Sequence, residues 1–290
     1  MLWKAILSVD FIIDILRATT PILLATLGAC MAAKAGICNM ALDGIMLFAA
    51  LFGVIFSNLT GSWIASLILT AISGAIMGAI LAFFVLNLKT DEILAAIAIN
   101  LTATGGTVLL LLAFSGDRGS STFETHSAPA FHGINIMTVI ALVLVVVIHL
   151  FLYKTPLGLQ IRSVGENKDA AESVGIKSIK IQYIALILSG TLGALGGYFL
   201  SSGYMNAFTK NMQSGRGFIA LAAAAMGANT PIGGFIVALL FGAAQAIANQ
   251  LQLTSIPVEL IQMIPYATVL VGLAVFSYSA KKKKEKLSNS

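Results

Sequence analysis

Charge is scarce in this sequence of 290 residues, which holds 17 basic and 12 acidic side chains. Charged residues make up 10% of the chain and apolar residues 58%, and the mean hydropathy is +0.94. Soluble domains carry roughly 25% charged residues, so the composition excludes an ordinary soluble protein. It predicts an integral membrane protein.

Further absences exclude other classes. The sequence has no GxxxxGK[ST] phosphate-binding loop, so the chain does not bind and hydrolyse ATP by that route. Its two cysteines, Cys30 and Cys38, lack CxxC spacing and neighbouring histidines. We expect both to be buried, with no metal and no disulfide. No Ser-His-Asp order, Cys-His pair or paired carboxylates within the apolar segments indicate catalysis, so we expect no enzyme activity in this chain.

The net charge of +5 is concentrated near the C-terminus, where the run KKKKEK at 281–286 carries a net +4. Such a run is typical of a solvated tail facing anionic lipid headgroups. We therefore predict a basic cytoplasmic tail at 281–290, with membrane lipid as its neighbour and no nucleic-acid partner.

Long apolar windows cover most of the remaining chain. A bilayer core of about 30 Å needs roughly 20 helical residues. Two windows are short and predict broken helices, which membranes tolerate where protein or a water-filled cavity satisfies the freed backbone groups. The fold class is therefore all-α, a single polytopic membrane domain over 1–280 with about eight to ten segments. The windows are 19–33 and 216–229, which are the short ones, and 39–57, 63–87, 91–114, 134–153, 181–202, 231–251 and 256–280.

Two local patterns refine this picture. Residues 6–16 place Asp10 and Asp14 on one helix face, which predicts a helix lying along the membrane interface. Glycines with GxxxG spacing occur at Gly74/Gly78 and Gly193/Gly197. They mark either tight helix contacts or a chance spacing.

One charged segment, 154–180, stands between two apolar windows and must lie in water. If it shares a side with the C-terminal tail, Lys34 and Lys89 fall there too, and that side receives 12 of the 17 basic residues. Cytoplasmic loops carry the excess of Lys and Arg, so we expect the segment and the C-terminus to be cytoplasmic. The polar stretch at 115–133 is then extracytoplasmic.

Within this segment, Ser163 and Glu166 have capping-box spacing, Asn167 is a second candidate N-cap, and Gly175 is a natural stop. The pattern predicts a short helix at 166–174 with a narrow apolar face of Ala170, Ala171 and Val174. Two turns are too few to be stable alone in water. The helix must pack either on the chain's own helix ends or on a partner protein.

Three stretches carry a resemblance to a known family. The run SVGENKDAAESVGI, preceded by TPLG and followed by LILSGTLGALGGYFLS, resembles the coupling segment of ATP-binding-cassette (ABC) importer permeases of the ribose, branched-chain amino acid and nucleoside kind. TPILLATLGACMAAKAGICNMALDGIMLFAA at 20–50 and GRGFIALAAAAMGANTPIGG at 215–234 are similar to two further blocks of these permeases. The likeness is greatest to the shorter nucleoside permease, and then to the simple-sugar permeases. The family usually has Glu at Asp43 and Arg at Lys34.

The resemblance implies a type II ABC importer transmembrane domain in the bacterial cytoplasmic membrane. This chain would form the translocation path for a nucleoside or simple sugar. Its partners would be a second permease subunit, an extracytoplasmic substrate-binding protein and a cytoplasmic ATPase that binds ATP and Mg²⁺, while this chain holds no cofactor. The resemblance assigns ATPase coupling to Glu166, Asn167, Lys168, Asp169, Ala170, Ala171, Glu172, Ser173, Val174 and Gly175.

Polar residues inside the apolar windows are candidates for the substrate path. Asp43, with Asn39 one turn earlier, either faces the path and binds ribose hydroxyls or braces the helix break after Gly36. The other candidates are Asn100, Gln245 and Asn249, which interhelical hydrogen bonding explains as well as a pore lining does.

Two rival functions remain open at this point. An ion-gradient-driven secondary transporter or channel would work without an ATPase, although such carriers usually hold several ionisable residues deep in their spans and only Asp43 and His149 lie in clear apolar windows here. A non-transporting membrane scaffold would use the short helix only for docking.

Overall fold

The computed structural model describes residues 9–121, 125–131, 133–252, 260–261, 263–274 and 278, and the predicted tail at 281–290 lies outside them. The elements run in the order α2 (Val9–Lys34), α3 (Leu42–Thr60), α4 (Trp63–Ala82), α5 (Glu92–Ser115), β1 (Ala130–Phe131), β2 (Ile134–Asn135), α6 (Ile136–Lys154), α7 (Pro156–Glu166), α8 (Lys168–Ser173), α9 (Ser178–Phe199), α10 (Arg216–Met226) and α11 (Pro231–Leu251). Short π-helical turns extend α4 (η1, Phe83–Asn87) and α9 (η2, Leu200–Tyr204), and a further apolar helix covers Met263–Ala274.

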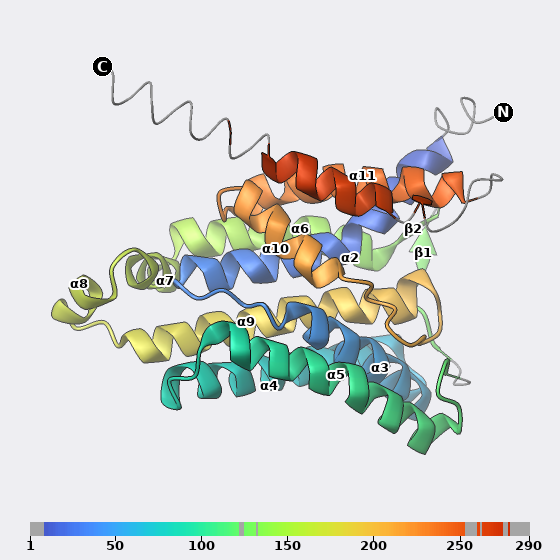
Figure 1. Cartoon of the computed structure of the whole chain (residues 1–290), viewed down its shortest axis with the longest axis horizontal. Coiled ribbons are helices and arrows are strands. Elements are labelled where there is room, and N and C mark those ends of the chain that lie inside the picture. The colour runs from blue at the N-terminus through green and yellow to red at the C-terminus, as the bar shows by residue number, and fades with distance from the viewer. Residues whose placement is uncertain are drawn as a thin grey trace.

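The long helices lie side by side in one elongated bundle (Figure 1). The short helices α7 and α8 stand at one end, which we call the α8 end. The antiparallel pair β1–β2, in which Ala130 faces Asn135, lies at the opposite end, which we call the hairpin end.

Seven helices in the described part of the chain are long and apolar enough to cross a membrane, and each matches a predicted window. The eighth window, at 216–229, is confirmed as a short helix, α10, of 11 residues. At 1.5 Å per residue it spans about 16 Å, roughly half of a bilayer core. The ninth window is described only in part, as Met263–Ala274.

The prediction of a short helix at 19–33, separate from an interfacial helix at 6–16, is wrong, although the helix does end before Ala35 and Gly36 as expected. α2 is one continuous helix of 26 residues, and the described part of the supposed interfacial helix forms its first turns. Pro21 lies inside this helix, where neighbouring helices can compensate for its missing N–H. Arg17 is accommodated because its guanidinium donates to Tyr204 O at 2.6 Å and stacks 5.1 Å from the Tyr204 ring centre.

Both GxxxG pairs mark tight helix contacts. A Cβ atom on Gly74 would lie 2.2 Å from Ala194 Cβ in α9, and one on Gly78 would lie 2.4 Å from Leu186 O. In α9, a Cβ atom on Gly197 would lie 2.1 Å from Met46 O of α3. Only glycine permits these approaches, so α9 packs closely on both α3 and α4 and, with α2 on its other side, lies at the centre of the bundle (Figure 1).

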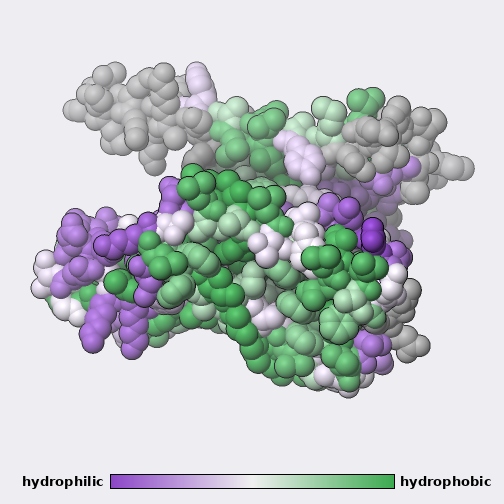
Figure 2. All heavy atoms as spheres, turned by 60° about the horizontal axis from the view of Figure 1, so that its bottom comes forward, coloured by the Kyte–Doolittle hydropathy of each residue, from purple (hydrophilic) through white to green (hydrophobic). Residues whose placement is uncertain are grey.

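The outward faces of α4, α5 and α6 are apolar. Ile68, Leu101 and Val143 are each more than half exposed, and Figure 2 shows the α4–α5 side as a broad hydrophobic surface with polar residues gathered toward the two ends. A soluble protein rarely exposes such a surface, whereas lipid tails cover it at no cost. The bundle axis therefore crosses the membrane, with the α8 end and the hairpin end on opposite sides.

Candidate functional site

The charged segment at 154–180 folds into two consecutive helices at the α8 end. α7 begins at Pro156, where the Thr155 hydroxyl accepts a hydrogen bond from Gly158 N at 3.1 Å. α8 follows directly, and the Asn167 side chain caps it by accepting from Ala170 N at 3.0 Å.

The predicted helix at 166–174 is therefore shorter, Lys168–Ser173, and the predicted capping box is wrong. Ser163 lies inside α7, where its hydroxyl donates to Leu159 O. Thr155 and Pro156 start a helix upstream, so Glu166 falls in its last turn rather than in the first turn of the next helix. Gly175, with φ of +86°, follows α8 as predicted.

α8 packs on the bundle through one side chain. Of the ten predicted coupling residues, only Ala171 is buried, in a cluster with Ile161 and Val164 of α7. Ala170 is exposed and Val174 is 77% exposed, so the predicted apolar face does not pack on the chain as a whole. The other nine predicted coupling residues are exposed.

α7 also touches the segment that links α2 to α3. A Cβ atom on Gly165 would lie only 2.2 Å from Lys34 O, and Gly36, with φ of +79°, packs against Gly165 Cα. The chain from residue 35 to 41 then runs without helix into the bundle, and we call it the break. The end of α7 therefore lies in close contact with the end of α2 and the start of the break.

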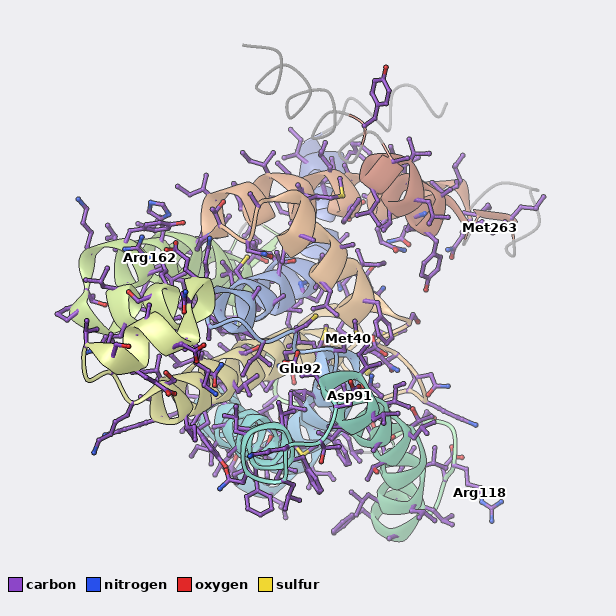
Figure 3. All side chains as sticks on the ribbon, turned by 60° about the vertical axis from the view of Figure 1, so that its left-hand side comes forward. Met40, Asp91, Glu92, Arg118, Arg162 and Met263 are labelled. Carbon is purple, nitrogen blue, oxygen red and sulfur yellow. The ribbon has the colours of Figure 1, made fainter. Side chains whose placement is uncertain are left out.

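Two of the predicted path residues hold the break in place. Asn39 is fully buried, and its amide donates to Ser189 Oγ at 2.9 Å and accepts from Ala41 N at 3.1 Å. Asn100 of α5 donates to Met40 O at 3.0 Å and accepts from Gly44 N at 2.8 Å. Glu92 at the start of α5, labelled together with Met40 in Figure 3, accepts a hydrogen bond from Cys38 N of the break.

Asp43 joins the first turn of α3 to the first turn of α10. Its carboxylate accepts from Gly217 N at 3.0 Å and from the Gln213 amide at 3.3 Å, and the side chain is 8% exposed. A carboxylate is stabilised at a helix N-terminus by the free N–H groups and the helix dipole. This geometry favours a bracing role over contact with a substrate, but the carboxylate braces the start of α10 rather than the break after Gly36.

Cys38 is not buried, contrary to the prediction. Cys30 is buried as predicted, but Cys38 is exposed because it lies in the extended break, where its N–H donates to Glu92 Oε2 at 3.0 Å. Partial burial, and secondly the Glu92 carboxylate, raise the pKa of its thiol above the ordinary value. Among the described residues, no three His, Cys, Asp or Glu side chains come together as a metal site.

Gln245 and Asn249 lie elsewhere, in the last turns of α11 near the hairpin end. Together with Tyr204, Lys210, Arg216 and Tyr266 they line a cavity of about 530 Å³. We call this cavity the outer pocket. The loop that closes it is held by strand-like pairing, because Lys210 N donates to Gly119 O at 2.9 Å and Ser121 N donates to Phe208 O at 2.8 Å.

The structure thus divides the five predicted path residues into two groups. Asn39, Asp43 and Asn100 lie around the break, whereas Gln245 and Asn249 line the outer pocket. Sequence reasoning missed Tyr204 and Tyr266 because tyrosine is common at membrane boundaries. The sequence could have indicated Arg216 as a site residue, since it is a charged residue at the edge of an apolar window.

Comparison with known proteins gives a consistent result. Residues 11–273 match the family model described as branched-chain amino acid transport system / permease component. The guanosine ABC transporter permease protein NupQ of Bacillus subtilis is 32% identical, with 88% of each chain covered. The nucleoside ABC transporter permease protein NupC of Lactococcus lactis is 30% identical, over 91% of this chain and 90% of that one.

A putative glucose ABC transporter permease protein, TsgC13 of Haloferax volcanii, is 29% identical over 88% of this chain and 80% of that one. No solved structure matches the chain significantly.

Proposed function

We propose that this chain, which belongs to the permease family of branched-chain amino acid transport systems, carries a nucleoside across the bacterial plasma membrane. As a multi-pass permease subunit of an ABC transporter, it is a transport component rather than an enzyme. The nucleoside proposal is supported by two nucleoside permeases that align over about nine tenths of the chain. The glucose permease relative makes a simple sugar the second candidate.

The proposed assembly has four kinds of component. Membership of an ABC permease family implies a separate ATPase and a substrate-binding protein. We assign ATP and Mg²⁺ to that ATPase, and a second permease subunit to the other half of the translocation path. The ATPase is cytoplasmic and the binding protein extracytoplasmic.

The distribution of charge supports an orientation with the α8 end in the cytoplasm. Among the described residues, this end carries more basic side chains than the hairpin end, as the positive-inside rule requires. The proposed orientation also puts the C-terminus in the cytoplasm. The basic residues at the α8 end are Lys34, Lys89, Lys154, Arg162, Lys168, Lys177 and Lys180, and those at the hairpin end are Arg17, Arg118, Lys210 and Arg216.

The coupling proposal rests on α8, whose residues are exposed except for the buried Ala171. Nine of the ten residues at 166–175 are exposed and available to the ATPase, while Ala171 anchors the helix to the core. The contact between Gly165 and Lys34 passes a displacement of α7 to the break, and Asp43 links α3 to α10, which borders the outer pocket. ATP-driven motion at the α8 end thus has a packed route to the opposite end.

Reconstituted uptake tests the coupling. Glu166→Arg and Ala170→Arg place a bulky cation on the exposed docking surface, and we expect both to abolish ATP-driven uptake while membrane insertion and binding of the solute by the binding protein persist. Leu88→Arg, at a 55% exposed position of the same end but outside the coupling segment, is the matched control. Normal uptake by the two coupling variants would refute the role of α8.

A further inference from the structure

The outer pocket has the size and position of a small-molecule site. Its volume of about 530 Å³ lies within the range of roughly 300–1,000 Å³ that small-molecule sites occupy. Its walls come from η2, the loop before α10, the last turns of α11 and the start of the helix at 263–274. The pocket therefore lies on the side from which a binding protein would deliver the solute.

A chain of hydrogen bonds orients the amide groups in this wall. The Gln245 amide donates to Asn249 Oδ1 at 3.1 Å, and the Asn249 amide donates to the Tyr204 hydroxyl at 2.8 Å. These bonds use part of the capacity of each amide, which has two donor hydrogens and an oxygen with two lone pairs. A ligand with an amide-like edge or hydroxyl groups thus meets pre-oriented partners.

The two tyrosines of the wall have different roles. The ring of Tyr204 is held by guanidinium groups, with Arg17 at 5.1 Å and Arg216 at 5.9 Å from its centre. Tyr266 is 47% exposed, and its hydroxyl donates to Ser214 O at 2.7 Å, which fixes the ring beside Gly215. Tyr204 therefore supports the amide chain, whereas Tyr266 offers a fixed aromatic surface to the cavity.

The charge of the wall limits the ligand further. Arg216 and Lys210 line the pocket, and none of the described residues that line it is a carboxylate. The Arg216 guanidinium is tied to its own loop by bonds to Met212 O at 2.8 Å and Gln213 O at 3.3 Å. Such a wall disfavours a cationic solute and is compatible with an uncharged one.

We propose that the outer pocket is a solute subsite for an uncharged nucleoside, in which Tyr266 stacks on the base and Gln245 and Asn249 bind its polar edge. The inference rests on the proposed function and deepens it, because it assigns base selectivity to this permease as well as to the binding protein. A free sugar has no flat ring to stack on Tyr266, so the subsite favours a nucleoside over ribose.

The test uses the complete transporter in proteoliposomes with its binding protein and ATP. Uptake of guanosine, cytidine and ribose is measured at concentrations that saturate the binding protein, so that differences report the permease. The variants are Gln245→Leu, Tyr266→Ala and Tyr266→Phe, which keeps the ring. Gln250→Leu is the matched control, since Gln250 lies on the same helix but bonds to Asp14 and does not line the pocket.

We expect Gln245→Leu and Tyr266→Ala to lower maximal nucleoside uptake about tenfold, the scale of one lost stacking or base-edge contact. The guanosine-to-cytidine ratio should change, and ATP hydrolysis stimulated by the binding protein should continue. Tyr266→Phe keeps the ring but loses the bond to Ser214 O, so it should lose less uptake than Tyr266→Ala, and Gln250→Leu should stay within about twofold of the parent. Unchanged uptake, or an equal loss for all solutes together with hydrolysis, would overturn the subsite. A parent complex that carries no nucleoside would instead refute the proposed function.

Discussion

The break and the outer pocket both place amide side chains among apolar helices, but they use them differently. At the break, Asn39 and Asn100 bond to the backbone or to a side chain of the fold at both ends of their amides. In the outer pocket, Gln245 and Asn249 bond to each other and to Tyr204, and their side chains face a cavity. The first arrangement stabilises a non-helical segment, whereas the second leaves polar groups for a passing solute.

The difference follows from where backbone groups lack partners. Residues 35–41 are not helical, so some of their buried backbone groups need side-chain partners, as Ala41 N finds in Asn39 and Met40 O in Asn100. α11 is an unbroken helix at residues 245–249, so its backbone groups bond within the helix and do not need these side chains as partners. Polar residues next to a break therefore stabilise the fold by bonding to its backbone groups. Polar residues on an intact helix are better candidates for binding a solute.

The largest effect on stability is expected at Asp43. Asp43→Ala leaves Gly217 N and the Gln213 amide without their acceptor in a buried place, and we expect a loss of about 3 kcal/mol in the free energy of unfolding. Asp43→Asn keeps an acceptor for Gly217 N and should cost less than half as much. Denaturant unfolding of the purified chain in detergent measures both, and equal stability of Asp43→Ala and the parent would contradict the bracing role.

A smaller loss is expected where α10 meets α3. A Cβ atom on Gly217 would lie 2.4 Å from Asp43 N and Cα, so Gly217→Ala forces the two helices apart at a cost of about 2 kcal/mol. Gly105→Ala in α5 is the control, because nothing lies within 4 Å of that position, and it should be neutral or slightly stabilising. The same unfolding assay compares them. A neutral Gly217→Ala would show that the contact between α3 and α10 is loose.

The smallest expected effect is on the reactivity of Cys38 at the exposed rim of the break. Its raised pKa lowers the thiolate fraction at neutral pH, so alkylation by iodoacetamide should be slow and should accelerate as pH rises. Glu92→Gln removes the carboxylate that contributes to the shift and should speed alkylation severalfold at pH 7.5. Cys30 is fully buried and should not react in the folded protein. An unchanged rate in Glu92→Gln would exclude the electrostatic effect of Glu92.

Much of the fold could be predicted from the sequence, because span length and hydropathy are set by bilayer thickness. The short α10 and the tight contacts of Gly74 and Gly197 also follow from local residue types. The continuity of α2 does not, since Pro21 and Arg17 interrupt the apolar pattern and only the packing of Arg17 on Tyr204 shows how the helix accommodates it. The predicted start of α8 at 166 is two residues too early because two candidate N-caps, Ser163 and Asn167, lie within five residues and only Asn167 caps the helix.

The candidate site was less predictable. Their residue type makes Asn100 and Gln245 equal candidates for the substrate path. Their roles differ because Asn100 lies beside the break and Gln245 lines the outer pocket. Tyr266 joins the outer pocket through its bond to Ser214, 52 residues earlier in the chain. No local pattern carries that information, since it depends on how the helix at 263–274 lies against the loop before α10.

The most direct test measures stability and transport together for Asn100→Leu and Gln245→Leu. We predict a crossed result: Asn100→Leu lowers the free energy of unfolding while each folded transporter keeps its solute preference, and Gln245→Leu keeps the stability of the parent but loses about tenfold in nucleoside uptake and changes its preference. If both variants lose stability and uptake in parallel, or if Gln245→Leu transports normally, the division between a structural break and a solute-binding pocket is contradicted.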